Sequence, residues 1–478
     1  MTNTQEPIYD ARKLGVGKML LLGIQHMFAM FGATILVPIL VNNYFGGQLT
    51  AALTVSVTLF CAGAGTLLFH LCSKFKVPAF LGSSFAFLGG FATIASLDTG
   101  KYAGMAADEK VLYACGGIVI AGLLYLVLAL IVKLIGVKRV MRFIPPVVTG
   151  PIIICIGLSL AGSAISNAST NWLLAIIALV TIIIFNIWGR GMFKIIPILM
   201  GVVVSYLFAL LFQALGMTNP DGSQILNFAP VAASKWVGLP PFRIAKFDIT
   251  AILVMAPIAL ATMMEHIGDI SAISSTTGIN YIKDPGLHRT LTGDGLATTV
   301  ASLFGAPANT TYGENTGVLT LTKVYDPAVI RLAAWFAVAL SFCPKFAAII
   351  EIMPAEVIGG ISLVLYGMIS AVGVRNLVET HCDFSKSRNV LIAALILVLS
   401  LGISNSAMGA INIPAGSMTI SFSGLATGSL VGIILNAVLP GKDYVFDEGE
   451  PNDTGVDLQI AQGENLGEEM EAKKARKN

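Results

Sequence analysis

Long apolar runs alternate with short polar stretches along most of this chain. A helix needs about 20 apolar residues to cross a bilayer, with some latitude for tilt. The runs therefore predict seven membrane spans, a polar linker at 217–247, and seven further spans. They fall at 19–41, 50–72, 78–97, 112–136, 146–163, 171–188 and 195–216, and then at 249–271, 293–304, 307–322, 328–350, 355–374, 388–403 and 416–440.

The basic residues support this topology. Cytoplasmic loops of membrane proteins collect Lys and Arg. With fourteen spans and a cytoplasmic N-terminus, most of the 29 basic residues fall on the cytoplasmic side. The six exceptions are Lys101, Lys110, Lys235, Arg243, Lys246 and Lys345. We therefore predict two cytoplasmic termini and an extracellular linker, with no signal peptide before the first span.

Composition excludes an ordinary soluble protein. Hydrophobic residues make up 55% of the 478 and charged residues 12%, and the mean hydropathy is +0.81. A soluble chain carries about 25% charged residues. The six cysteines show no paired spacing, which argues against a disulfide framework or a zinc site. No nucleophile–base pattern appears either, so we expect no enzyme. We also expect no cofactor and no nucleic-acid partner.

The pattern divides the chain into five parts. We expect a cytoplasmic N-terminus, two seven-span repeats separated by an extracellular linker, and a disordered cytoplasmic tail. The tail is acidic and then basic, with few apolar residues. In order, these parts are residues 1–18, 19–216, 217–247, 248–440 and 441–478.

Two broken spans occupy matched positions in the two halves. The third span opens Pro78-Ala79 and the tenth opens Pro307-Ala308, and small or polar residues interrupt both. Seven spans per half is an odd number, so the halves would have opposite orientations in the membrane. A pair of interrupted segments in inverted repeats is a strong sequence pointer to a transporter's substrate site. Either segment alone could also be an ordinary kinked helix.

The broken segments have a direct physical use. Pro removes an amide donor and Gly loosens a helix, so we expect each segment to be extended first and helical afterwards. Unwound backbone at membrane depth is tolerated only where it is buried in protein or lines a cavity. Two such segments would offer free amides and two helix N-termini to a polar solute.

Three carboxylates stand out within predicted spans, where charges are costly and usually functional. They are Glu265, Asp269 and Glu314. Glu265 and Asp269 are four residues apart, so on a helix they share a face with about 5–6 Å between Cβ atoms. Two like charges that close in an apolar wall disfavour joint ionisation, so one of them could carry a proton. Alternatively, the helix ends near residue 264 and both acids lie in solvent.

Other polar residues in the spans have more than one interpretation. His266 is one step round the helix from Glu265 and suits a structural hydrogen bond better than a ligand. Gln25 and His26 form a polar pair in an apolar helix, which is typical of a contact between helices. Tyr312 could stack on a flat ring or fill a helix interface.

A family resemblance follows from these residues. Glu314-Asn315-Thr316-Gly317, followed after four residues by Thr322-Lys323, resembles the signature of the nucleobase–ascorbate transporter family. The resemblance covers about 12–440 and includes Gln25-His26, 78–85, Glu265-His266 and the stretch 283–298. The greatest likeness is to bacterial uracil:proton symporters.

The resemblance implies an all-helical, fourteen-span fold built as a seven-plus-seven inverted repeat in the bacterial inner membrane. Spans 1–4 and 8–11 would form a core domain, and spans 5–7 and 12–14 a gate domain. Short strands in spans 3 and 10 would cross at the substrate. Homodimers are usual in the family.

The resemblance also implies roles for individual residues. Glu265 would accept hydrogen bonds from the ring N–H groups of uracil, and Glu314 would hold the opposite edge. Backbone amides of Phe85 and Gly313 would bind the carbonyls, and Tyr312 would pack on the ring. Glu265, Asp269 and Glu314 would couple transport to protons. The supporting polar residues would be Gln25, His26, Ser84, His266 and Asn315.

One departure leaves the substrate open. Uracil symporters usually carry His where this chain has Asp269, and purine carriers often have Asp. Purine carriers, however, usually begin the signature with Gln, whereas this chain has Glu314. We give Glu314 more weight because it would touch the substrate, with Asp269 one turn away governing the proton. Xanthine or another purine, and an anion exchanger or channel of the same architecture, remain alternatives.

Overall fold

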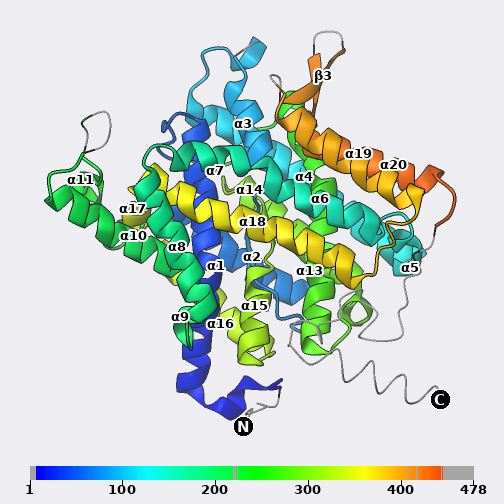
Figure 1. The fold of residues 1–478 in the computed structure, drawn as a ribbon, viewed down its shortest axis with the longest axis horizontal. Helices are drawn as coiled ribbons and strands as arrows, with labels where there is room; N and C mark the ends of the chain where they lie inside the picture. The colour runs from blue at the N-terminus through cyan, green and yellow to red at the C-terminus, as the bar shows by residue number, and fades with distance from the viewer. Residues whose placement is uncertain are drawn as a thin grey trace.

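A computed structural model describes residues 7–98, 100–218, 222, 224–406, 409–415, 418–442 and 444. Most of the predicted tail, and residues 1–6, lie outside these ranges. The described chain is largely helical, and helices from both halves of the sequence lie side by side (Figure 1). The protein is therefore a multi-pass helical membrane protein.

Eight helices, some with a local break, are long and apolar enough to cross a membrane among the described residues. A ninth candidate consists of α16 and α17, which meet at an angle of 88°. The bounds are α1 Val16–Tyr44, α2 Val55–Cys72, α4 Ala107–Ile135, α6 Pro146–Ser159 with α7 Ala161–Ala168, α10 Pro197–Ala214, α12 Ile249–Met255 continuing into α13 Ala259–Thr277, α16 Pro327–Ser341, α17 Pro344–Glu351, α18 Ala355–Glu379 and α19 Ser387–Ser404.

Shorter elements fill the spaces between these helices. Two three-residue strands, β1 Leu81–Ser83 and β2 Asn309–Thr311, precede the short helices α3 Leu88–Ser96 and α15 Glu314–Thr322. The remaining helices are α5 Val137–Met141, α8 Trp172–Trp188, α9 Met192–Ile195, α11 Ala229–Ala233, α14 Leu287–Leu303 and α20 Gly424–Val438, and the last two strands are β3 Ala410–Ala415 and β4 Met418–Ser423.

The helices pack most extensively within two groups. In one group α14 lies against α4 and α2, and α16 lies against α2 and α1. In the other, α18 lies against α6, α7 and α8, and α19 lies against α20 and α6. Small residues allow the closest approach, because a Cβ on Gly295 of α14 would lie 2.8 Å from the carbonyl oxygen of Gly122 in α4. Both groups combine segments from the two halves of the chain.

Two predicted elements differ from the structure. The last apolar run, 416–440, was expected to be one helix, but β4 occupies its start and α20 begins only at Gly424. Strand β4 pairs with β3 as an antiparallel hairpin. The ninth predicted span, 293–304, begins earlier than expected, because α14 starts at Leu287 after a glycine with φ of 101°.

Candidate substrate site

Two short strands from distant parts of the sequence pair with each other. Strands β1 and β2 are antiparallel, and Gly82 lies opposite Thr310. Each strand leads within a few residues into a short helix, α3 beginning at Leu88 and α15 at Glu314. The predicted order of extended segment followed by helix is therefore confirmed in both broken segments. The N-terminal ends of α3 and α15 therefore flank the same strand pair.

Neighbouring helices supply hydrogen bonds to the outer edges of this strand pair. A buried polar backbone group without a partner costs free energy, and no water is available in the hydrocarbon core. Hydroxyl groups from α2 and α14 fill this need, and a carbonyl of α1 accepts from the side chain of Ser83. The bonds are Leu81 N to Thr66 Oγ1 (2.9 Å), Thr298 Oγ1 to Asn309 O (2.8 Å) and Ser83 Oγ to Thr34 O (3.0 Å).

Tyr312 locks the two strands together. Its amide donates to the carbonyl of Phe80 at 2.9 Å, and its hydroxyl donates to the carbonyl of Ser83 at 2.8 Å. The ring packs directly over Gly82, where an added Cβ would lie 2.5 Å from ring carbons. Position 82 therefore requires glycine for this approach. Tyr312 is thus anchored through its backbone amide and its hydroxyl, and the residue is 5% exposed.

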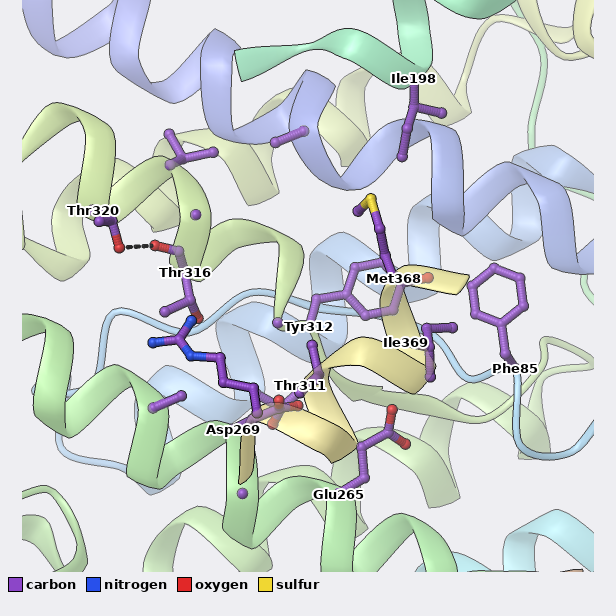
Figure 2. A pocket seen from close by; sticks show the side chains of 18 of the residues that line it. Phe85, Ile198, Glu265, Asp269, Thr311, Tyr312, Thr316, Thr320, Met368 and Ile369 are labelled. Atoms are coloured by element: carbon purple, nitrogen blue, oxygen red, sulfur yellow. Dashed lines mark hydrogen bonds between the residues drawn. The ribbon is translucent and has the colours of Figure 1, made fainter. Parts of the chain in front are cut away.

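A cavity of about 450 Å³ lies against this strand pair (Figure 2). Its volume falls in the range of ordinary small-molecule sites, about 300–1,000 Å³. Five of the residues predicted to bind or support the substrate line it together. They are Ser84, Phe85, Glu265, Tyr312 and Gly313. Thr316 and Thr320 extend the polar wall along α15.

Glu265 and Asp269 both line this cavity from α13. The helix continues to Thr277, so the two acids do not lie in solvent beyond its end. Asp269 is 6% exposed, and Glu265 is more exposed. Asp269 Oδ1 lies 3.3 Å from where a Cβ on Gly313 would be. Both carboxylates therefore belong to the cavity wall.

The opposite wall comes from α10 and α18. Ile198, Met368 and Ile369 line it, and Figure 2 shows Ile198 and the two carboxylates on opposite sides of Tyr312. Phe85 and Tyr366 of α18 meet edge to face with ring centroids 5.7 Å apart. Apolar and aromatic groups thus face the acids across the cavity. The sequence gives no sign of this wall, because these residues lie within apolar stretches of their helices.

The remaining predicted residues lie elsewhere or outside the description. Glu314 is the first residue of α15, but its side chain lies outside what the structure describes. Asn315 turns away from the cavity lining and donates from Nδ2 to the carbonyl of His26 at 3.1 Å. Gln25 is not among the lining residues described. The pair His26–Asn315 therefore joins α1 to α15, as a contact between helices.

His266 lies on another face of α13 from the acids. Its Nδ1 is 2.9 Å from Thr311 Oγ1, and that hydroxyl donates to Asp294 Oδ1 at 3.0 Å. His266 Nδ1 and Asp294 Oδ2 are 3.4 Å apart, and both side chains are fully buried. The structural hydrogen bond predicted for His266 is present. It ties α13 and α14 to strand β2.

Asp294 is a fourth carboxylate that the sequence analysis did not single out. It is wholly buried in α14, inside the stretch Thr-Gly-Asp-Gly. A signal was present, since a carboxylate flanked by glycines within a predicted span is costly without a partner. The partners Thr311 and His266, however, come from other segments. Only the fold shows that Asp294 supports the strand beside the cavity.

The chain is similar in sequence to known permeases. Residues 17–409 match the model of a permease family, Xan_ur_permease. The uracil permease of Bacillus caldolyticus is 39% identical over 465 residues, covering 93% of this chain and 98% of that protein. The uracil permease of Bacillus subtilis is 38% identical over 448 residues, covering 89% and 94%.

A solved structure shares the fold. The transmembrane domain of a cyanobacterium bicarbonate transporter, BicA, aligns with a TM-score of 0.54 and 16% identity, covering 80% of this chain and 96% of that one. At this identity the likeness speaks for the fold alone. Family membership is shown by the match to the family, which spans most of the residues, and by the two relatives. The chain belongs to this family of permeases, which are transporters and not enzymes.

Proposed function

We propose that this permease takes up uracil by alternating access, driven by protons that move inward with it. The observation that carries the proposal is the cavity in which a carboxylate pair faces the ends of two paired strands. Relatives named uracil permeases, aligned over about nine-tenths of the chain, support the same substrate. Transport would occur as helices on the two sides of the cavity change their relative position.

The chemistry of the base fits the groups of the cavity. Uracil is a flat ring with N–H donors and carbonyl acceptors along its edges. Glu265 would accept from ring N–H groups, and Glu314 would hold the opposite edge. The backbone amides of Phe85 and Gly313, which lie just before the helices α3 and α15, would donate to the carbonyls. The ring of Tyr312 would pack against the base.

The proton would be carried by the acids of α13. Glu265 and Asp269 are one helical turn apart in the wall of a cavity that Lys194 and Arg375 also line. Joint ionisation of two such carboxylates is unfavourable, so one proton can be shared between them and released when the surrounding changes. Glu314 would take part as a third acid. Substrate and proton would thus be bound by the same cavity.

The finer architecture is part of the proposal. Fourteen spans would form two inverted seven-span repeats at 19–216 and 248–440, joined by an extracellular linker at 217–247. The two packing groups would correspond to a core domain that holds the broken spans and a gate domain that faces them. Residues 1–18 and 441–478 would lie in the cytoplasm of a bacterial cell, with the protein in the inner membrane as a homodimer.

Two observations favour alternative substrates. Asp269 stands where purine carriers often have Asp, so xanthine or another purine base is the second candidate. Lys194 and Arg375 line the cavity, and the fold is shared with a bicarbonate transporter, which would suit an anion exchanger. Against anions, Glu265 and Asp269 line the same cavity and would repel them.

The proposed substrate is tested by uptake in a bacterial strain that lacks its own nucleobase carriers. We expect radiolabelled uracil to accumulate, to be competed by excess unlabelled uracil, and to be lost when a protonophore collapses the proton gradient. Bicarbonate and xanthine serve as competitors in the same panel. Accumulation of xanthine that ignores excess uracil would contradict the proposal.

The role of the two glutamates as direct ligands is tested by Glu265→Gln and Glu314→Gln. Each change keeps the shape but places an amide donor where an acceptor is needed. A mismatched buried hydrogen-bonding group costs about 1–3 kcal/mol, so affinity should fall about tenfold or more. Uracil binding to purified protein measures this effect.

A matched control for these variants is Glu109→Gln. Glu109 is exposed in α4 and forms a surface ion pair with Lys246 at 2.5 Å. Surface pairs contribute little to stability, so this variant should bind like the parent. If Glu265→Gln and Glu314→Gln both bind uracil with near-parental affinity, the two glutamates are not direct ligands.

Asp269→Asn separates binding from proton coupling. Asp269 is only 6% exposed, so a substrate would touch it less than Glu265. We expect binding to fall less than in Glu265→Gln, while proton-driven accumulation falls and its pH profile shifts, because Glu265 loses a like-charged neighbour. Binding assays beside pH-jump uptake into proteoliposomes measure both effects.

The control for the coupling test is Asp284→Asn, because Asp284 is exposed and pairs with Lys76 at the surface. Asp269→His should be milder than Asp269→Asn, since His also titrates near neutrality. If Asp269→Asn accumulates uracil with the parental pH profile, the proton is carried by Glu265 or Glu314 without it.

A further inference from the structure

A short N-terminal segment crosses the end of α15. Residues 8–11, which we name the strap, run beside the segment that follows this helix, and Ile8 pairs in parallel with Val324. Ile8 donates its amide to the carbonyl of Lys323 and accepts from the amide of Tyr325, both at 2.8 Å. Figure 1 shows the start of the chain beneath α15 and α16. The strap thus holds the end of α15 by two backbone hydrogen bonds.

The strap also reaches α13. The hydroxyl of Tyr9 donates to the carbonyl of Thr277, the last residue of α13, at 2.8 Å. The Tyr9 ring packs on Tyr325 with a centroid distance of 5.5 Å. One residue of the strap therefore contacts both the end of α13 and the segment after α15.

A third anchor involves a shared carboxylate. Asp326 Oδ1 accepts from the amide of Ala328 and caps α16, whereas Oδ2 accepts from the amide of Ala11, both at 2.8 Å. Ala11, Val324 and Val329 are buried and form a small hydrophobic cluster apart from the main core. The strap is thus a packed element with its own apolar contacts.

The two helices that the strap joins are those that carry the acids of the site. Glu265 and Asp269 lie on α13, and Glu314 begins α15. Helix α15 has only nine residues, and isolated helices of that length are marginal. Strand β2 holds the residues before it, and the strap holds the backbone after it. Movement of α15 along its axis would break the strap bonds.

We propose that the strap is a positioning element for substrate binding. It ties the end of α13 to the segment after α15, so that the carboxylates of α13 and the start of α15 keep a fixed separation at the cavity. This role rests on the proposed function, because the site acids are assigned there. Tyr9 and Asp326 are the positioning residues, and they act through the helices without touching the substrate.

The test uses the full chain with the double substitution Tyr9→Phe and Asp326→Asn. Phe keeps the ring contact with Tyr325 and removes the bond to Thr277. Asn keeps an oxygen to cap α16 but can turn an amide donor toward the Ala11 amide. The control is Asp10→Asn, because the Asp10 side chain accepts from the nearby Arg12 amide at 3.1 Å and lies on the exposed side of the strap.

We expect uracil affinity to fall about three- to tenfold in the double variant. The KM of uptake should rise by a similar factor, with little change in maximal rate or pH profile. Hydrogen exchange without ligand should be faster by about the same factor at residues 323–325, with increased exchange extending into 314–322. The control should behave like the parent in every measurement.

Two results would overturn the positioning role. One is unchanged exchange at 323–325. The other is faster exchange there, or a lower melting temperature, with unchanged uracil affinity, because the strap would then only stabilise the protein. If the parent protein itself does not bind uracil, the proposed substrate fails. In that case, hydrogen exchange in residues 262–269 and 314–322 of the double variant tests the strap separately. Unchanged exchange in both segments would overturn its positioning role.

Discussion

The arrangement of this permease depends on the pairing of unwound backbone within a membrane protein. Strands β1 and β2 interrupt what would otherwise be helical spans, and each break leaves amides and carbonyls that lipid cannot satisfy. The backbone groups of the two breaks form hydrogen bonds with each other. The hydroxyls of residues such as Thr66 and Thr298 form hydrogen bonds with backbone groups at the outer edges. The same interruption leaves the starts of α3 and α15 available beside a cavity. The pairing that satisfies the unwound backbone thus also places the N-terminal ends of two helices beside the cavity.

Helix α13 links this strand pair to the proposed proton chemistry. One face presents Glu265 and Asp269 to the cavity, and another presents His266 to Thr311 of β2. Thr311 in turn bonds Asp294 of α14. A change in the charge of the cavity acids would therefore act on a helix that is fastened to the strands. This arrangement would give the proposed substrate binding and the proposed proton transfer a common structural support.

The sequence predicted the broken spans because their cause is local. Pro78 and Pro307 interrupt hydrogen bonding in their own segments, and the repeated Pro-Ala opening marked both breaks. The same local reasoning placed Glu265 and Asp269 on one helical face. The hairpin of β3 and β4 had a local signal as well, since apolar and polar residues alternate along Met418–Ser423. That signal was hidden inside an apolar run long enough to count as a span.

Other parts of the site could not be predicted because their partners are distant in sequence. Asp294 meets His266 and Thr311 only through the packing of α13, α14 and β2. Ile198 and Met368 lie in apolar helices whose pattern gives no sign of which face meets the cavity. The close approach of Asp269 to Gly313 likewise depends on how α13 crosses α15. Spacing along one helix defines a face, and tertiary packing decides what that face contacts.

The most direct measurement is an experimental structure of the protein with uracil bound in lipid. The account predicts density for a flat ring in the cavity beside Tyr312, with one edge on the Glu265 carboxylate and ring carbonyls on the amides of Phe85 and Gly313. Ring density elsewhere, or in the cavity without contact to either the carboxylate or the strand-end amides, would contradict it.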